Sequence, residues 1–180
     1  MRRDSRAIAL LAVLTALPTA LGYVLGPLTH SLNAVLGLIP FNPVRFYLGF
    51  MPLLISTVLA RAYLGRGGAI VEGLLLAITG VLLHPTKPIP IILSKDILLG
   101  LGVEFSLIGS SDLRLIPILS SSLLGGLGHC LPFLLFTYLR LGFFSSSLWF
   151  VPNMLLSALI GGYITHLILR RLPAESSLRA

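Results

Sequence analysis

Apolar residues run through this chain in long stretches, and short polar segments separate the stretches at intervals. A helix that crosses a bilayer needs about 20 predominantly apolar residues. The stretches that reach or approach this length cover residues 7–25, 46–64, 68–83, 89–108, 115–139 and 148–169. The segments between them are rich in Gly, Pro and Ser, which favour turns. The pattern predicts an all-α integral membrane protein with six transmembrane helices in a single domain, residues 1–180.

Three of the expected elements are unusual. The first stretch contains Pro18, which removes a backbone hydrogen bond and predicts a kink. The fourth stretch is the least apolar, because Lys95, Asp96 and Glu104 lie within it. The longest connection, residues 26–45, contains three prolines around a short apolar segment, and we expect it to lie on the membrane surface or to dip into it.

The composition supports a membrane protein. The chain is 56% hydrophobic and 11% charged, whereas a soluble domain is about 25% charged. A pI near 10.3 would indicate nucleic-acid binding in a soluble protein. Here the arginines lie at the ends of apolar stretches, where membrane topology favours them. We therefore expect contact with membrane lipid and no binding of nucleic acid.

The distribution of Lys and Arg predicts the orientation of the chain. Cytoplasmic segments carry an excess of these residues. With the N-terminus inside, the inner segments hold nine of them: Arg2, Arg3, Arg6, Arg61, Arg66, Arg114, Arg170, Arg171 and Arg179. The outer segments hold three: Arg45, Lys87 and Arg140. Both termini are therefore expected in the cytoplasm.

Polar residues of several expected helices lie at a similar depth in the outer half of the membrane. Ionisable groups in hydrocarbon are costly and usually face a cavity or a partner. At about 1.5 Å per residue, Lys95 and Asp96 lie roughly 10 Å from the outer end of their helix. We predict a substrate pocket that opens outward and is framed by aromatic side chains. Its candidate residues are Arg45, Lys95, Asp96, His129, Tyr138, Trp149 and Asn153.

Each of these residues also has a purely structural interpretation. Lys95 and Asp96 could neutralise each other or extend toward the interface. His129 could be a packed histidine, and Arg45 could only anchor a helix end. Tyr138 and Trp149 could belong to the aromatic belt at the membrane surface. The agreement in depth between separate helices is what favours a site.

The remaining acidic and histidine residues give no sign of a cofactor. Glu72 and Glu104 are expected in the inner half, where Glu72 is interpreted as the partner of an inner arginine. The histidines are scattered, and neither an HxxxH nor a CxxC pattern is present. The glycine-rich turn at residues 65–68 lacks the Lys-Ser/Thr of a phosphate-binding loop. We expect no metal or cofactor in this chain, and we expect that it does not hydrolyse ATP by itself.

Small residues recur every fourth position in the first stretch, at Ala12, Ala16 and Ala20. Such a stripe lets another helix approach closely, because dispersion contacts replace the hydrophobic drive that is absent in lipid. The neighbouring helix could belong to a partner protein or to this chain itself.

Three features together resemble a known family. They are the basic N-terminus before the alanine stripe, the run RFYLGFMPLL at residues 45–54, and its continuation GRGGAIVEG at residues 65–73. The chain resembles the substrate-binding S component of energy-coupling-factor (ECF) vitamin transporters. The resemblance covers the whole chain in length and number of spans, and its motifs lie in the first half.

This resemblance implies a function. Such proteins are six-helix binders in the prokaryotic plasma membrane that capture a vitamin or related micronutrient from outside. They associate with a transmembrane coupling protein and two cytoplasmic ATPases, which hydrolyse the ATP. The resemblance assigns Ala12, Ala16 and Ala20 to the contact with the coupling protein. It also places the pocket among helices four to six, with the connection at 26–45 as its lid.

Two other functions are compatible with some of these residues. A polytopic membrane hydrolase could use Asp96, His129 and the serine runs, but an aspartyl mechanism needs a second carboxylate at the same depth. No GxSxG signature is present. A stand-alone secondary transporter would favour internal repeats or broken helices in both halves, and we find no repeat. The expectation is a non-enzymatic binding subunit.

Overall fold

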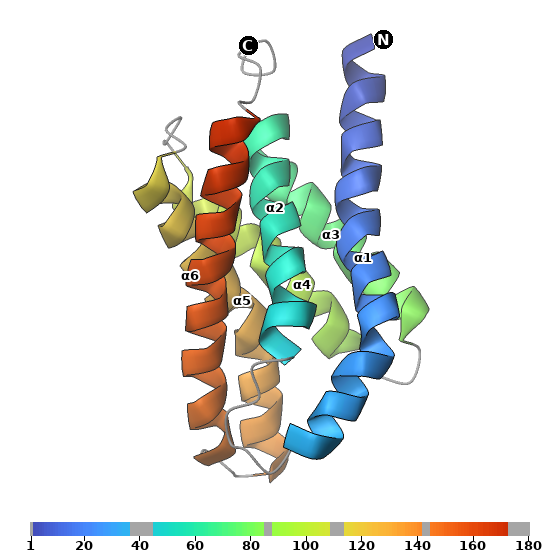
Figure 1. Ribbon diagram of the computed structural model, residues 1–180, viewed down its shortest axis with the longest axis vertical. Coiled ribbons are helices and arrows are strands. Elements are labelled where there is room, and N and C mark those ends of the chain that lie inside the picture. The colour runs from blue at the N-terminus through green and yellow to red at the C-terminus, as the bar shows by residue number, and fades with distance from the viewer. Residues whose placement is uncertain (1, 37–44, 85–87, 109–113, 142–144, 173–180) are drawn as a thin grey trace.

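The computed structural model describes residues 2–36, 45–84, 88–108, 114–141 and 145–172 (Figure 1). These residues form helices and no strand. The elements are α1 (Arg2–Leu36), the short π-helix η1 (Arg45–Phe50), α2 (Met51–Leu64), α3 (Gly68–Leu83), α4 (Ile89–Ser106), α5 (Leu115–Leu141) and α6 (Ser145–Arg171). The expected all-α class is confirmed.

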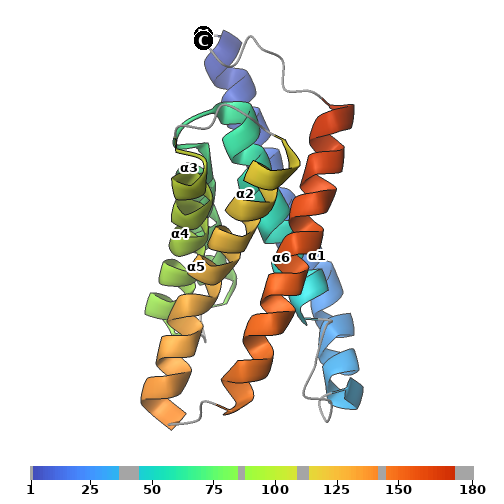
Figure 2. The same ribbon diagram turned by 90° about the vertical axis from the view of Figure 1, so that its left-hand side faces the viewer.

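Helix α2 is the centre of the bundle. It contacts each of the other helices, while α1 packs on α3, α3 on α4, α4 on α5, and α5 on α6. Figure 2 shows α3, α4 and α5 along one side of the bundle and α6 along the other. Several α2 side chains have no exposed surface, among them Leu54, Thr57 and Val58. The core therefore follows α2, and the other helices surround it.

The outer faces of the surrounding helices are apolar. Large hydrophobic side chains such as Ile8, Leu82, Phe105, Ile116 and Leu139 are between 67% and 79% exposed. A water-soluble protein rarely exposes so much apolar surface, whereas lipid accommodates it. The chain is therefore a membrane protein by the surface that its helices expose.

Four helical segments are long and apolar enough to cross a membrane: Ser5–Leu28, Tyr47–Leu64, Leu115–Phe136 and Val151–Arg171. Helix α3 is apolar but shorter, with 16 residues. Helix α4 has 18 residues and carries the charged side chains Lys95, Asp96 and Glu104. The six expected stretches thus correspond to six α-helices among the described residues, of which these four satisfy the length and hydropathy of a span.

The largest difference from the expected boundaries concerns α1. The sequence predicted a helix that ends near Leu25, but α1 continues to Leu36 with Pro18 and Pro27 inside it. A proline removes one intrahelical hydrogen bond and bends a helix, yet its fixed φ is compatible with helical geometry on both sides. Figure 1 shows the second half of α1 bent away from the axis of its first half. Part of the expected connection is therefore helical.

Helices α5 and α6 differ less from their expected bounds. They are longer at their ends, since α5 reaches Leu141 and α6 extends from Ser145 to Arg171. Helix α4 is shorter than expected, because it ends at Ser106. Helix ends are the part of an element that local patterns define least well.

Helix α4 packs against both of its neighbours through glycines. A Cβ on Gly100 would lie 2.5 Å from the Ala69 carbonyl oxygen of α3, and one on Gly102 would lie 2.5 Å from the Leu124 carbonyl oxygen of α5. Glycine lets helix backbones approach this closely, as is common in membranes. These contacts hold α3, α4 and α5 together as one tightly packed layer.

An ion pair joins α2 to α4 at the end of the bundle that contains the α2–α3 turn. Arg61 Nε lies 3.0 Å from Glu104 Oε1, and the Gly67 N–H donates to the same oxygen at 2.9 Å. Gly67 has a φ of 84°, in the left-handed region that favours glycine. The predicted turn at residues 65–68 is confirmed, and the hydrogen bond from Gly67 to Glu104 connects it to the end of α4.

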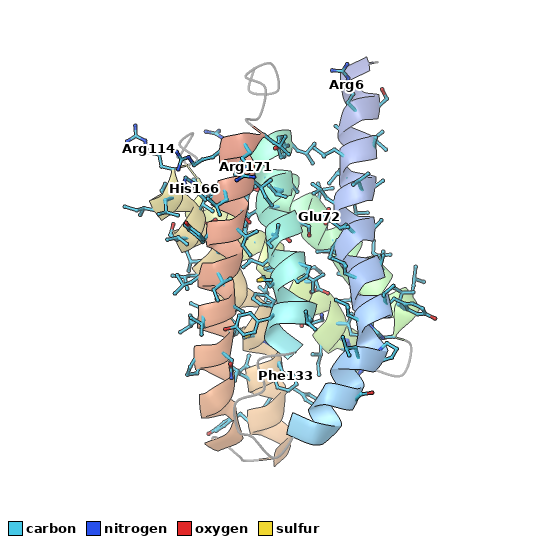
Figure 3. The ribbon with its side chains drawn as sticks, in the orientation of Figure 1. Arg6, Glu72, Arg114, Phe133, His166 and Arg171 are labelled. Carbon is cyan, nitrogen blue, oxygen red and sulfur yellow. The ribbon has the colours of Figure 1, made fainter. Side chains whose placement is uncertain are left out.

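Basic residues gather at this same end of the molecule. Figure 3 shows Arg6, Arg114 and Arg171 at the end of the bundle where α1 begins and α6 ends. Arg61 belongs to the last turn of α2, which ends here as well. The segments that hold most of the arginines in the sequence thus meet at one end of the folded bundle.

Candidate functional site

A cavity of about 570 Å³ lies in the half of the bundle away from the start of α1 and the end of α6. Its walls come from the later turns of α1, from η1 and the start of α2, from the end of α3, from the start of α4 and from the later turns of α5. The volume falls within the usual range for small-molecule sites, about 300–1,000 Å³. The cavity can hold a ligand the size of a vitamin.

The polar side of this cavity is a cluster of Lys95, Asp96 and His129. Lys95 Nζ lies 3.2 Å from Asp96 Oδ1, and His129 Nδ1 lies 3.2 Å from the same oxygen. The Asp96 side chain is 3% exposed, whereas that of Lys95 is 28% exposed. A carboxylate this deeply buried needs partners, and the cation and the imidazole provide them.

Close backbone packing sets the position of Asp96. A Cβ on Gly73 of α3 would lie 2.6 Å from the Asp96 carbonyl oxygen, so α3 and α4 touch at the level of the carboxylate. From the other direction, the Phe50 ring of η1 lies 4.8 Å from the His129 ring, centroid to centroid. Two neighbouring elements, α3 and η1, therefore hold the cluster of α4 and α5 in place.

The rest of the cavity wall is largely apolar and aromatic. Phe50 and Leu53 line it from η1 and α2, Leu76 lines it from α3, and Phe133 and Phe136 line it from α5. Figure 3 shows Phe133 in the half of the bundle away from the start of α1 and the end of α6. A largely apolar wall with one polar cluster is typical of a site that holds an organic ring and orients it by a few polar contacts.

The structure brings together three of the predicted site residues, Lys95, Asp96 and His129, at this cavity. Tyr138 and Asn153 are placed elsewhere. Tyr138 is 56% exposed, Asn153 is buried at 1%, and neither is a lining residue of the cavity. An aromatic residue near the end of a membrane helix commonly lies at the interface, which fits the exposed position of Tyr138.

The side chains of the other two predicted residues, Arg45 and Trp149, lie outside the part of the chain that the structure describes. The resemblance placed the pocket among helices four to six. The described lining residues come from α1 to α5, so α4 and α5 contribute as expected and α1 to α3 contribute in addition. The α6 side chains of residues 145–150 and residues 37–44 of the expected lid lie outside the part of the chain that the structure describes.

Sequence reasoning missed the contribution of α1 and α3 to the cavity. Thr19 and Tyr23 line it from α1, and Thr79, Gly80 and His84 line it from α3. The spacing of Pro18, Gly22 and Gly26 was a usable signal, since small residues and prolines on one face leave room beside a helix. The site also includes the end of α3, which lies at the same depth as Lys95 and Asp96. The cavity-lining residues of α3 include no Asp, Glu, Lys or Arg.

Glu72 lies apart from this cavity, between α1 and α3. It has no exposed surface, and the Thr15 hydroxyl donates to its Oε2 at 2.9 Å. The sequence-based interpretation paired Glu72 with an inner arginine, and this was wrong. The arginine of that region, Arg61, pairs with Glu104 instead, because the end of α4 lies beside the end of α2.

The alanine stripe of α1 faces outward. Ala12, Ala16 and Ala20 are all exposed, so the described residues of this chain leave the stripe uncovered. Among the described residues, no group of three or more His, Cys, Asp or Glu side chains is placed to hold a metal.

Comparisons with known proteins found no family model, no curated protein and no solved structure that matches this chain.

Proposed function

We propose that this chain is the membrane-embedded substrate-binding subunit of an ATP-driven importer of the ECF type. It captures a vitamin or vitamin precursor from outside a prokaryotic cell, and it delivers this ligand through association with a coupling protein and two ATPases. In this proposal all six helices cross the plasma membrane, with both termini in the cytoplasm.

The observation that carries the proposal is the cavity. It is about 570 Å³ in volume and is lined mainly by apolar side chains, and its buried ion cluster is supplied by α4 and α5. Buried charges in a membrane protein are expensive, and a binding role is the usual reason for them. The position of the cavity, away from the basic end of the bundle, supports loading from outside by the positive-inside rule.

The exposed face of α1 supports the association with a coupling protein. Ala12, Ala16 and Ala20 leave a shallow surface on which a second helix packs closely without steric conflict. The family resemblance assigns the same three residues to this contact. A binding subunit needs two separate surfaces, one for the ligand and one for the partner, and the cavity and this stripe lie on different parts of the chain.

The proposal is tested by purifying the tagged protein from its native membrane and analysing what accompanies it. We expect a small organic molecule in the mass spectrum of the denatured sample, and ATPase subunits in the pull-down. The Asp96→Ala variant serves as the matched control, since it removes the buried carboxylate and leaves the α1 stripe intact. It should lose the small molecule and keep the ATPase subunits.

Two results would contradict the proposal. Equal amounts of the small molecule with wild type and Asp96→Ala would remove Asp96 from the site. The absence of any ATPase subunit from both preparations would exclude an importer of this type.

A further inference from the structure

The Asp96 carboxylate presents two different oxygens. Oδ1 is enclosed and is contacted by Lys95 Nζ and His129 Nδ1, each at 3.2 Å. Oδ2 lies on the side of Gly80, where a Cβ added to that glycine would be 3.6 Å away. Within the described part of the chain, no side chain donates a hydrogen bond to Oδ2. Since Asp96 and Gly80 both line the cavity, Oδ2 is an acceptor that a ligand can use.

Lys95 supplies a donor next to this acceptor. Its ammonium group carries three N–H donors, and the contact with Asp96 Oδ1 uses one of them. The side chain is 28% exposed and lines the cavity. A hydrogen-bond donor and a hydrogen-bond acceptor therefore stand side by side on one wall, fixed by adjacent residues of α4.

The charge of this wall favours a neutral ligand. The cavity is lined by the oppositely charged Lys95 and Asp96 and by the imidazoles of His84 and His129. With both imidazoles in the neutral form, the charges of Lys95 and Asp96 cancel. A ligand with a net charge would remain uncompensated in an apolar cavity, which is costly. A neutral ligand with an N–H beside a C=O matches both groups without adding charge.

The space around the polar wall favours a flat ring. Phe50 lies against the cluster, and Phe133 and Phe136 line the same cavity. Gly80 has no side chain beside Oδ2, and a methyl group there would also come within 2.9 Å of Ile92 Cγ2. The absence of a side chain at Gly80 keeps open the place where the edge of a ring would reach Oδ2.

We propose that the cavity recognises a neutral planar heterocycle through a cyclic amide or imide edge. The ring N–H donates to Asp96 Oδ2, the neighbouring carbonyl accepts from Lys95 Nζ, and Gly80 determines specificity by leaving room for that edge. This proposal rests on the proposed function, because it names the class of substrate for the same site.

The test uses lumazine, a fluorescent bicyclic imide, and two methylated forms of it. Methylation at N1 leaves the imide N3–H between its two carbonyls, whereas methylation at both N1 and N3 leaves the ring without any N–H. Binding to the purified protein is followed by the change in ligand fluorescence. We expect lumazine and 1-methyllumazine to bind, and 1,3-dimethyllumazine to bind at least about tenfold more weakly, because it leaves Oδ2 without a donor.

A pair of variants then examines the role of Gly80. Gly80→Ala adds one methyl group beside Oδ2 and should weaken lumazine binding at least about tenfold. Ile78→Val removes one methyl group from a side chain of α3 that is 53% exposed and does not line the cavity. It should leave lumazine affinity unchanged.

The outcomes separate this proposal from the proposed function. Equal affinity for the two methylated compounds, no binding of any of the three compounds, or full binding by Gly80→Ala would overturn the recognition of an imide edge. If the protein still co-purifies with another small molecule and with ATPase subunits, the importer function stands while this substrate class fails. If nothing co-purifies, both fail.

Discussion

The contact between Thr15 and Glu72 joins two helices at a point that lipid and water do not reach. Both side chains are almost fully buried, at 7% and 0% exposure. Ser56 of α2 is buried as well, at 3%, and its hydroxyl donates to the Leu53 carbonyl. The Thr15 hydroxyl also donates to the Leu11 carbonyl of its own helix, so Glu72 is its partner on the neighbouring helix. The buried carboxyl of Glu72 is costly to leave without a donor.

We expect Glu72→Ala to destabilise the protein by about 2 kcal/mol, because it leaves a cavity and removes the partner of Thr15. Glu72→Gln keeps the length and an acceptor oxygen, so its loss should stay below about 1 kcal/mol. Thermal unfolding of the detergent-solubilised variants measures both. If Glu72→Ala and Glu72→Gln unfold at the same temperature as wild type, the contact does not hold α1 to α3.

At the scale of the elements, the layer of α3, α4 and α5 is held by glycines that face backbone atoms of the next helix. Gly100 approaches the Ala69 carbonyl of α3, and Gly102 approaches the Leu124 carbonyl of α5. No side-chain rearrangement can relieve a methyl group placed against a main-chain carbonyl. This rigid layer supports the polar wall of the cavity.

Gly100→Ala should therefore destabilise the protein by about 1–3 kcal/mol through overpacking. Gly22→Ala is the control, since a Cβ at Gly22 of α1 meets nothing within 4 Å. There the higher helix propensity of alanine should stabilise the protein slightly or leave it unchanged. Melting temperatures that fall equally in the two variants would show that helix spacing is not the cause.

The second prediction for the elements concerns the exposed alanine stripe of α1. Under the proposed function, Ala16→Leu places bulk on the exposed stripe and blocks the close approach of a partner helix. We expect ligand binding by the purified protein to be unchanged and uptake by whole cells to fall below about a tenth of wild type.

Leu17→Phe is the control for this variant. It adds bulk to a side chain that is 58% exposed and lies about 100° around the helix from Ala16. Uptake should remain close to wild type. Normal uptake with Ala16→Leu would mean that the stripe faces lipid and no partner.

At the scale of the whole molecule, the bundle has two unlike ends. The basic end holds Arg6, Arg114 and Arg171 (Figure 3) as well as the Arg61–Glu104 pair, and the other end holds the cavity. In a membrane the basic end is expected in the cytoplasm. The cavity then opens toward the outside.

This orientation can be tested by labelling single cysteines with a membrane-impermeant maleimide in intact cells. The native Cys130 is 1% exposed, so the wild-type protein should react little and serves as the blank. Ile89→Cys, at the start of α4, should react from outside, whereas Arg66→Cys should react only after the cells are opened. Labelling of both positions in intact cells would contradict the six-span arrangement.

The sequence by itself determined that this is a helical membrane protein, where most helices begin and end, and that Lys95, Asp96 and His129 belong to one depth. These properties follow from apolar runs, turn residues and the rise of a helix, which are local. The glycine-rich turn at 65–68 was predictable for the same reason, because a left-handed φ selects for glycine.

Tertiary structure alone decided which walls enclose the cavity and which groups pair. The continuation of α1 to Leu36, the pairing of Glu104 with Arg61 and that of Glu72 with Thr15 depend on which helices become neighbours. Equal depth is shared by side chains that face a cavity, the core or lipid. Only the packing around α2 distinguishes Asp96 at the cavity from Asn153 in the core and Tyr138 on the surface.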